Sequence, residues 1–398
     1  MTALPHSAAE LLSAAAVRSQ SARVTDHVRA GRGHFELHED KLDVCAEFVA
    51  STTRARYPDL DIPYHSRWRH FSAPGSTLQA TYEHHEEALD ERERARAGFD
   101  LIVPSVLLDA GAGAVWSYLP DGCDERIGRS EGLGLASLGM FLAGQFSSSD
   151  SMTTDASALT SLTEEQLNAG FQISDANPLL GVGGRLAMMQ GLGRAILERP
   201  EVFPHQRPGD LVDHLVRDSP VRATAVLDVV LDVLAPIWPD RLEVEGVRLG
   251  DSWFYEPFGT GVDAIIPFHK LSQWLTYSLV ETLERVGIDV DGVESLTGLP
   301  EYRNGGLLYE TGVIGLRDPS LAVVAHQPGS PVIVEWRALT ITLLDEIAGR
   351  VKTVLGRPEM LLAEILEGGT WAAGRALAYE RDPLGTPPLT LESDGTVF

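Results

Sequence analysis

The spacing of apolar residues along the chain predicts a protein built mainly from helices. Apolar positions recur every three to four residues, the period of a helix with one buried face, over 8–30, 39–55, 209–236 and 266–286. One stretch differs. Residues 242–257, LEVEGVRLGDSWFYEP, alternate in character around Gly246, which predicts short strands joined by a tight turn. The predicted fold class is therefore mainly α, with a few short β-strands.

The chain is long enough for one large helical domain over residues 1–398. It is 44% hydrophobic, which suffices for one large core or two moderate ones. The clearest break is SSSDSMTTDAS, a run of small polar residues typical of a loop. We expect a single domain, which could divide into two lobes at this loop, near 147–158.

Charge and composition exclude several classes of protein. The formal net charge of -25 argues against a nucleic-acid partner, which needs clustered Lys and Arg. Two cysteines, Cys45 and Cys123, are too few for a disulfide framework or a cysteine zinc site. No apolar run reaches the roughly 18 residues of a membrane span, and the first residues lack the basic region of a signal peptide. We expect a cytoplasmic protein without a membrane partner.

Residues 65–71, HSRWRHF, gather cationic side chains and an indole in an otherwise acidic chain. His65 and His70 are five residues apart, which suits neither one helical face nor one strand face, so a metal pair is poorly supported. Whether the stretch is helical or extended, two cationic groups project together, which favours an anionic ligand for His65, Arg67 and Arg69. Pairing with some of the 57 acidic residues of the chain accounts for the composition equally well.

Three further segments place polar side chains between apolar runs, where acid–base chemistry is common. A histidine can shuttle protons near neutral pH, and a carboxyl beside aromatic rings can hold a proton. The candidate residues are Asp251, Trp253 and Glu256 in LGDSWFYEPFG, His269 and Lys270 in IPFHKLSQW, and Arg303 in PEYRNGGLLYETG.

The glycines of GVGG, residues 181–184, resemble a dinucleotide-binding loop only superficially. Such a loop follows a strand and opens a helix inside a βαβ unit, whereas here the surrounding pattern is helical. We therefore predict that these glycines allow close helix packing, and no cofactor is implied.

Several segments in this order resemble the uracil-catabolism (Urc/Urg) protein family of fungi and bacteria. They are HSRWRHF, VPSVLLDAGAGAVWSY, RSEGLGLASLGMF, NPLLGVGGRLAMMQGLG, LGDSWFYEP, PFHKLSQWLTYSLVE, GLPEYRNGGLLYETGVI and EWRALT. The resemblance implies a role in the non-reductive route of uracil degradation, beside a GTP-cyclohydrolase-II-like protein and a uracil phosphoribosyltransferase. It implies a small ribosylated pyrimidine breakdown product as the substrate, and association with other enzymes of the route is a further expectation.

A more distant resemblance links three segments to the queuosine salvage nucleosidases, which implies a helical DNA-glycosylase-like core. The matched positions are Asp109 and Trp116 in VLLDAGAGAVWSY, Asp251 and Trp253 in GDSWFYE, and Glu335, Arg337 and Ala338 in VIVEWRALTI. The segment IPFHKLSQWL departs from their pattern because Phe268 stands at the position of their catalytic aspartate. That aspartate therefore cannot be carried over.

The two resemblances and the candidate residues together predict a hydrolase. It would cleave the N-ribosyl C–N bond of a ribosylurea-type intermediate, with or without a 5-phosphate, and release urea. Such a reaction needs a carboxylate near the anomeric carbon and a proton donor for the leaving nitrogen. We expect Asp251 as the carboxylate or base, Glu256 as its alternative and His269 as acid or base. The expected substrate-binding residues are His65, Arg67, Trp68, Arg69, Asp109, Trp253, Lys270, Arg303 and Arg337.

Two alternatives stay open. One is a metal-assisted, ring-opening amidohydrolase of the same pathway that uses His65 and His70. The other is a non-catalytic partner of the cyclohydrolase-like protein.

Overall fold

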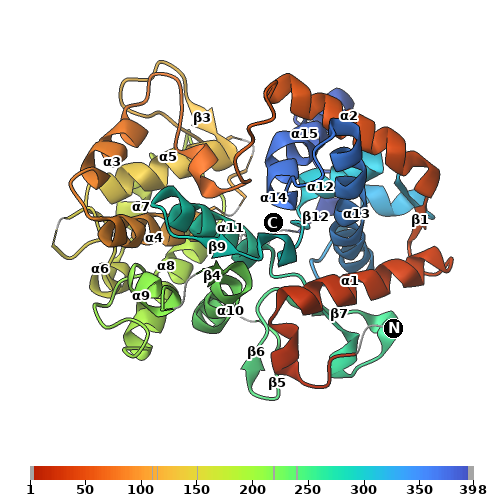
Figure 1. Cartoon of the computed structure of the whole chain (residues 1–398), viewed down its shortest axis with the longest axis horizontal. Helices are drawn as coiled ribbons and strands as arrows, with labels where there is room; N and C mark the ends of the chain where they lie inside the picture. Colours follow the sequence, from red (N-terminus) through yellow and green to blue (C-terminus); the bar gives the residue numbers. More distant parts are fainter. Residues whose placement is uncertain are drawn as a thin grey trace. The chain divides into compact units, whose positions relative to one another are not determined.

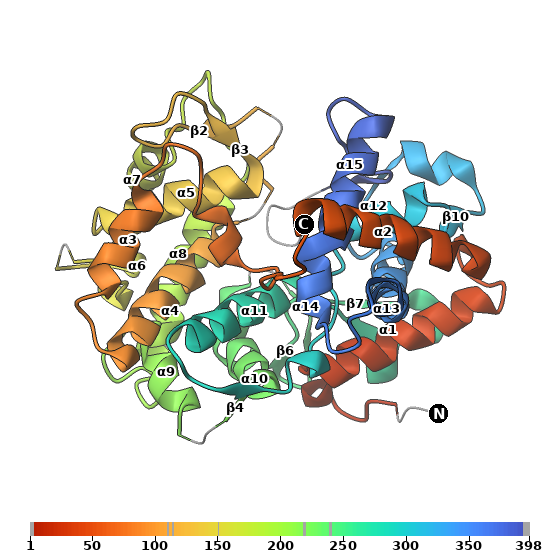
Figure 2. The same cartoon turned by 45° about the horizontal axis from the view of Figure 1, so that its top comes forward.

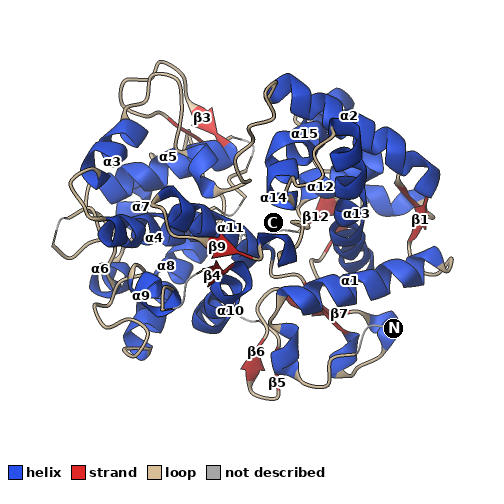
Figure 3. Cartoon of the chain, viewed as in Figure 1, coloured by secondary structure: helices blue, strands red, loops and turns tan. Residues whose placement is uncertain are grey.

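Helices make up most of the chain, and the strands are short and paired two by two (Figure 3). The computed structural model describes residues 4–109, 111–113, 115–149, 151–217, 220–238 and 241–392. Over these residues the predicted class, mainly α with a few short strands, is confirmed.

The chain folds into two compact units, each assembled from separate stretches of sequence (Figure 1). The described part of unit 1 comprises 4–65, 241–273 and 292–392, and that of unit 2 comprises the described residues from 66 to 238 together with 274–291. Helix α11 (Lys270–Arg285) begins in unit 1 and continues in unit 2 from Trp274. The predicted loop near 147–158 lies inside unit 2 and is not a passage between the units.

Helix α13 (Pro331–Leu355) is the central element of unit 1. Its side chains are buried almost continuously from Val332 to Leu344, and it packs against α1, α2 and α12 (Figure 2). Pro331 stands at the first position, where its missing N–H costs no hydrogen bond. The other helices of unit 1 are α1 (Ala14–Arg29), α2 (Leu42–Arg56), α12 (Tyr302–Glu310), α14 (Leu362–Ile365), the π-helix η9 (Leu366–Thr370), α15 (Trp371–Arg381) and the 3-10 helices η1 (Ala8–Leu11), η2 (Glu39–Lys41), η5 (Glu256–Phe258), η6 (Val262–Ala264), η7 (Val293–Ser295) and η8 (Pro319–Val323).

Short strands bring the polar segments of unit 1 together. The predicted turn at Gly246 is confirmed: β5 (Glu243–Val244) pairs with β6 (Val247–Arg248), and Glu245 and Gly246 both have positive φ. Next, β7 (Ser252–Phe254) runs antiparallel to β8 (Ile265–Pro267), which places the residues just before β7 beside those just after β8. The remaining strands of unit 1 are β1 (Phe35–Leu37), paired with β10 (Ile314–Leu316), and β11 (Ala325–His326), paired with β12 (Thr390–Leu391).

Unit 2 is a cluster of helices around α4 (Glu91–Leu107), which packs against α5, α8 and α9. Its other helices are the 3-10 helix η3 (Arg67–His70), α3 (Leu78–Glu86), α5 (Arg129–Leu142), α6 (Ala156–Ser161), α7 (Glu164–Gly170), α8 (Val182–Glu198), α9 (Asp210–Leu215), α10 (Ala223–Leu234) and the 3-10 helix η4 (Ala235–Ile237). Its strands are β2 (Ser117–Tyr118), paired with β3 (Ile127–Gly128), and β4 (Val221–Arg222), paired with β9 (Val290–Asp291). None of the helices in the described part of the chain is long and apolar enough to cross a bilayer.

The glycines of α5 and α8 serve different purposes. A Cβ on Gly134 would lie 2.6 Å from the carbonyl oxygen of His70, so this glycine lets η3 lie directly on α5. The prediction of close helix packing is wrong for Gly183 and Gly184, because a Cβ on either residue would meet nothing within 4 Å. Both occupy the open first turn of α8, and the glycines of that helix that do pack closely are Gly191 and Gly193.

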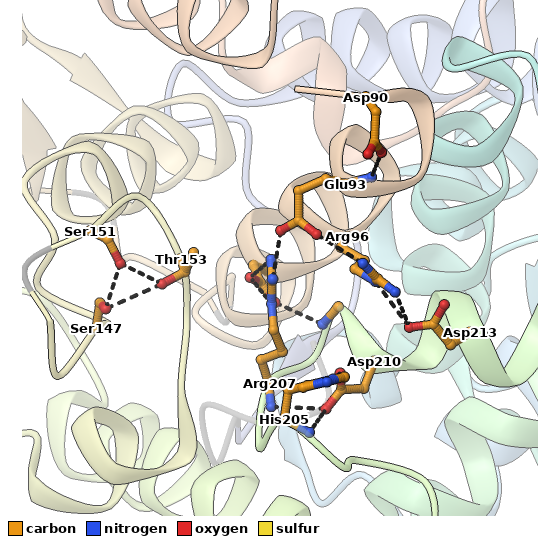
Figure 4. Close-up of polar contacts among 12 residues, drawn as sticks. Asp90, Glu93, Arg96, Ser147, Ser151, Thr153, His205, Arg207, Asp210 and Asp213 are labelled. Atoms are coloured by element: carbon orange, nitrogen blue, oxygen red, sulfur yellow. Dashed lines mark hydrogen bonds and ion pairs between the residues drawn. The ribbon is translucent and has the colours of Figure 1, made fainter. Parts of the chain in front are cut away.

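A polar network fixes the loop before α9 onto α4. Fully buried Asp100 accepts hydrogen bonds from the backbone N–H of Gly209 (2.7 Å) and from Nε of Arg207 (2.8 Å). Arg207 also binds Glu93, which in turn binds Arg96 (Figure 4). Burial raises the pKa of Asp100 to about 6, although Arg207 and the backbone donors oppose that rise. The folded state therefore binds a proton at Asp100 more readily than the unfolded chain does.

Stability should consequently depend on pH through Asp100. A carboxyl pKa raised from 3.8 to about 6 adds stability that is complete below about pH 4 and is lost as pH rises through 6, a span of about 3 kcal/mol. Asn at this position does not titrate. The free energy of unfolding of the wild type, relative to Asp100→Asn, should therefore rise as pH falls from 8 to 5 in urea titrations.

Asp251→Asn is the matched control, because the pKa of Asp251 is lowered and that group stays ionised over the same range. A difference between the wild type and Asp100→Asn that does not change with pH would contradict the prediction.

Candidate functional site

A buried ion pair lies at the centre of the candidate site in unit 1. Nη1 and Nη2 of Arg337, on α13, each donate to one oxygen of Asp251 at 2.7 Å. Asp251 also accepts from Trp253 Nε1 (2.9 Å) and from the backbone N–H of Lys270 (3.1 Å). Burial by itself would raise the pKa of Asp251, but these four donors outweigh it and hold the pKa well below its ordinary value. With four donors on its two oxygens, Asp251 is a fixed negative charge and is poorly suited to accept a proton.

His269 lies next to this pair, where β8 leads into α11. Its backbone has φ 47, a left-handed conformation that is uncommon for a residue with a side chain. The backbone N–H groups of Phe268 and His269 both donate to the carbonyl oxygen of Asp251, which holds the turn in place. Nε2 of His269 lies 3.0 Å from the carbonyl oxygen of Leu11. Because a carbonyl can only accept, Nε2 carries the proton and Nδ1 is the basic nitrogen of the neutral ring.

Burial lowers the pKa of His269, while the bond to Leu11 and the charge of Asp251 oppose that change. The imidazole is thus neutral at physiological pH, which suits a proton acceptor.

The N-terminus of α12 adds a second buried carboxyl. Glu301 accepts from the backbone N–H groups of Asn304 (2.6 Å) and Arg303 (2.8 Å), so it caps the helix. It is 8% exposed, and burial raises its pKa although those N–H groups and the charge of Lys270 oppose the rise. Nε of Arg337 reaches the carbonyl oxygen of the preceding residue, Pro300, at 3.5 Å. Glu301 is therefore connected to the Asp251–Arg337 pair through the backbone of Pro300, and to Lys270 through its charge.

The HSRWRHF stretch is divided between the two units after His65. In unit 1, Nδ1 of His65 lies 2.8 Å from Glu367, which also binds Arg56 and the hydroxyl of Tyr57 (3.0 Å each). Burial by itself would raise the pKa of Glu367, but His65 and Arg56 lower it to about 2. Glu367 lies in the π-helix η9, a helix type that is frequent at functional sites.

In unit 2, Arg67 and Asp109 form a second buried ion pair. The guanidinium of Arg67 is completely buried, with Nη1 3.3 Å from Oδ1 of Asp109. Nε donates to Ser105 (2.7 Å) and Nη1 to the carbonyl oxygen of Ser130 (3.2 Å), while the hydroxyl of Ser130 donates to Oδ2 of Asp109 (3.0 Å). Burial lowers the pKa of Arg67, and Asp109 opposes that change.

Trp68 and Arg69 of the same stretch contact α11 within unit 2. Arg69 forms an ion pair with Glu281, and the indole N–H of Trp68 donates to the hydroxyl of Thr282 (3.0 Å). Each arginine of HSRWRHF thus has a carboxylate partner, as the ion-pair interpretation of the sequence expects.

The structure brings together some of the predicted residues and separates others. Asp251, Trp253, His269, Lys270 and Arg337 form one cluster in unit 1, with Glu301 and Arg303 at its border. Glu256 is exposed on η5. His65 belongs to unit 1, whereas Arg67, Trp68, Arg69 and Asp109 belong to unit 2. The residues suggested for a metal, His65 and His70, therefore fall in different units, and no three metal-binding side chains gather within the described ranges.

Sequence comparison connects this arrangement to a protein family. Residues 10–398 match the family described as "Protein of unknown function (DUF1688)". The chain belongs to this family. It is similar to the protein named Protein urg3 of Schizosaccharomyces pombe, with 39% identity over 409 residues that cover 98% of each chain. It is also similar to Uracil catabolism protein 4 of Lachancea kluyveri, with 37% identity over 430 residues, 97% of this chain and 98% of that one. The resemblance to the uracil-catabolism family is confirmed.

Three buried polar residues of this DUF1688 protein were not predicted from the sequence as candidate site residues. Glu301 stands directly before Tyr302 and reads as a helix cap, which it also is. Glu367 sits beside two glycines, and that pair was the available signal of an irregular helix. Arg185, in the first turn of α8, donates to the carbonyl oxygens of Leu108, Leu180 and Gly111, and no local pattern marks it.

The Asp251–Arg337 pair should be essential to the stability of this DUF1688 fold. Arg337→Leu leaves a carboxylate buried without its main partner and should lower the free energy of unfolding by about 3–5 kcal/mol. Adding Asp251→Asn should recover part of this loss, because the stranded charge is removed. Urea unfolding of both variants measures the effect.

Arg350→Leu is the control, since it breaks a solvent-exposed pair with Asp43 and should change stability far less. An Arg337→Leu protein as stable as the wild type would show that the pair is not structurally important.

Proposed function

We propose that this chain acts in uracil catabolism and hydrolyses the N-ribosyl C–N bond of a ribosylurea-type compound. The pathway rests on the near full-length similarity to a protein named Uracil catabolism protein 4. The chemistry rests on one observation, the gathering of a neutral histidine, a fixed carboxylate and a protonatable carboxyl around the Asp251–Arg337 pair. No cofactor enters the proposal, and association with the cyclohydrolase-like protein is a separate prediction.

In the proposed reaction, the bond between the anomeric carbon and the ureido nitrogen breaks, and its electron pair goes to nitrogen. Glu301 gives a proton to that nitrogen, because urea is a poor leaving group as an anion. A water molecule adds to the anomeric carbon and gives one proton to Nδ1 of His269. The products are the free sugar and urea, and the proton on His269 returns to Glu301 through solvent.

Asp251 takes a different part in this proposal from the one that the sequence indicated. Its negative charge favours the oxocarbenium character that develops on the sugar, while its hydrogen bonds hold Trp253 and the first residue of α11. It is a stabiliser and a positioning residue, and the proton acceptor is His269. Glu301 replaces Glu256 as the second carboxyl, because Glu256 is exposed to water.

Urea release from ribosylurea and from its 5-phosphate tests the reaction directly. We expect the purified chain to release urea from at least one of them, and Glu301→Gln and His269→Gln each to lower kcat by about 10²–10⁴-fold. Since the pKa of His269 is lowered, the acid limb of the kcat/KM profile should lie below pH 6.5. That limb should vanish in His269→Gln.

Glu335→Gln is the matched control, a buried glutamate of unit 1 that binds Tyr255 and His34. It should change stability more than kcat. Folded protein that releases no urea from either compound would refute the proposed reaction.

A further inference from the structure

The Arg67–Asp109 pair of unit 2 has hydrogen-bonding atoms that the described part of the chain does not satisfy. Nη2 of Arg67 is buried without a hydrogen-bond partner, and so is Oδ1 of Asp109, whose ion pair with Nη1 is not aligned as a hydrogen bond. Both side chains are more than nine-tenths buried. Buried polar groups are nearly always paired, so an unmatched donor beside an unmatched acceptor calls for a third partner.

The charges around this pair indicate what kind of partner fits. Asp109 acts electrostatically on both Arg67 and Arg185, and Glu131 acts on Arg67. The formal charges of these four groups cancel. A phosphate or carboxylate would add a negative charge next to Asp109, which is unfavourable in a buried site. A neutral ligand that accepts from Arg67 and donates to Asp109 has no such penalty.

Two aromatic rings lie near the pair, and such rings stack well on planar groups. The Trp274 ring centre is 5.6 Å from the guanidinium carbon of Arg67, and the ring of His70 lies 5.7 Å from that of Trp274. Arg185 holds the carbonyl oxygens of Leu108 and Gly111, on either side of Asp109. Gly111 is exposed, so the chain reaches the surface two residues beyond Asp109.

We propose that the Arg67–Asp109 pair binds a neutral ureido or carboxamide group, whose carbonyl accepts from Nη2 of Arg67 and whose N–H donates to Oδ1 of Asp109. The inference concerns unit 2 alone and goes beyond the proposed function, whose residues lie in unit 1.

Binding of small probes tests this recognition without any turnover. Saturation-transfer NMR of the full chain with methylurea, acetamide, acetate and inorganic phosphate should show binding of the two neutral amides and not of the anions. Asp109→Asn exchanges an acceptor for an amide and leaves an excess positive charge. It should bind methylurea about tenfold more weakly and should gain binding of acetate or phosphate.

Asp100→Asn is the matched control, since it neutralises another buried aspartate of unit 2 that pairs with an arginine, and it should leave probe binding unchanged. If Asp109→Asn does not fold, Ser130→Ala serves instead. It removes only the hydroxyl that orients Asp109, and it should weaken methylurea binding several-fold.

Three outcomes would overturn the inference: no methylurea binding to the folded wild type, tighter binding of phosphate than of methylurea, or equal methylurea binding by Asp109→Asn. The first would mean that water alone satisfies the two atoms. Methylurea binding without urea release from ribosylurea would leave this inference standing and refute the proposed reaction. Urea release from ribosylurea without methylurea binding would support the proposed reaction and refute this inference.

Discussion

The buried pair between Asp251 and Arg337 is the interaction on which the candidate site of unit 1 depends. An ion pair in a protein interior repays the cost of desolvation only when nearly every lone pair and N–H is used. Here the carboxylate receives a bidentate guanidinium, an indole and a backbone amide. One aspartate thereby joins the long buried helix α13 to the β7–β8 ladder and to the start of α11, and the conformation of His269 follows from that junction.

The same principle, a buried arginine matched to a carboxylate, recurs in unit 2 with a different result. Arg207 and Asp100 form a network with many partners, and it holds the loop before α9 on α4. Both oxygens of Asp100 accept aligned hydrogen bonds, whereas Oδ1 of buried Asp109 accepts none from the described residues. In each pair Nη2 of the arginine lacks an aligned hydrogen bond, so the two pairs differ in their carboxylates. A buried carboxylate oxygen without a donor is what a binding role requires, and it distinguishes the candidate site from the scaffold within unit 2.

Much of the fold could be predicted because helices and tight turns depend on the spacing and type of residues that are close in sequence. The helical period predicted helices where α1, α2, α10 and α11 lie, and the glycine after Glu245 identified the β5–β6 turn. The site was harder because its contacts are long-range. Asp251 and Arg337 are 86 residues apart, and His65 and Glu367 are 302 apart. Neighbours in HSRWRHF turned out to serve different units, since closeness in sequence does not imply a shared surface. Gly183 and Gly184 of α8, which have no neighbour within 4 Å of a built Cβ, show that a glycine in the sequence does not by itself predict close packing.

The interleaved construction of the two units has a consequence for how the chain is made. Helix α1 packs on α13, and about 300 residues separate them in the sequence. The contact between α1 and α13 therefore cannot form until the ribosome has synthesised those residues. At the usual speeds of synthesis this takes roughly 15 to 60 s. The residues of unit 2 from 66 to 238 emerge in the interval, so the order of synthesis favours folding of that unit first. During the same period the apolar faces of α1 and α2 lack their final partner, and the nascent chain is then most dependent on chaperones.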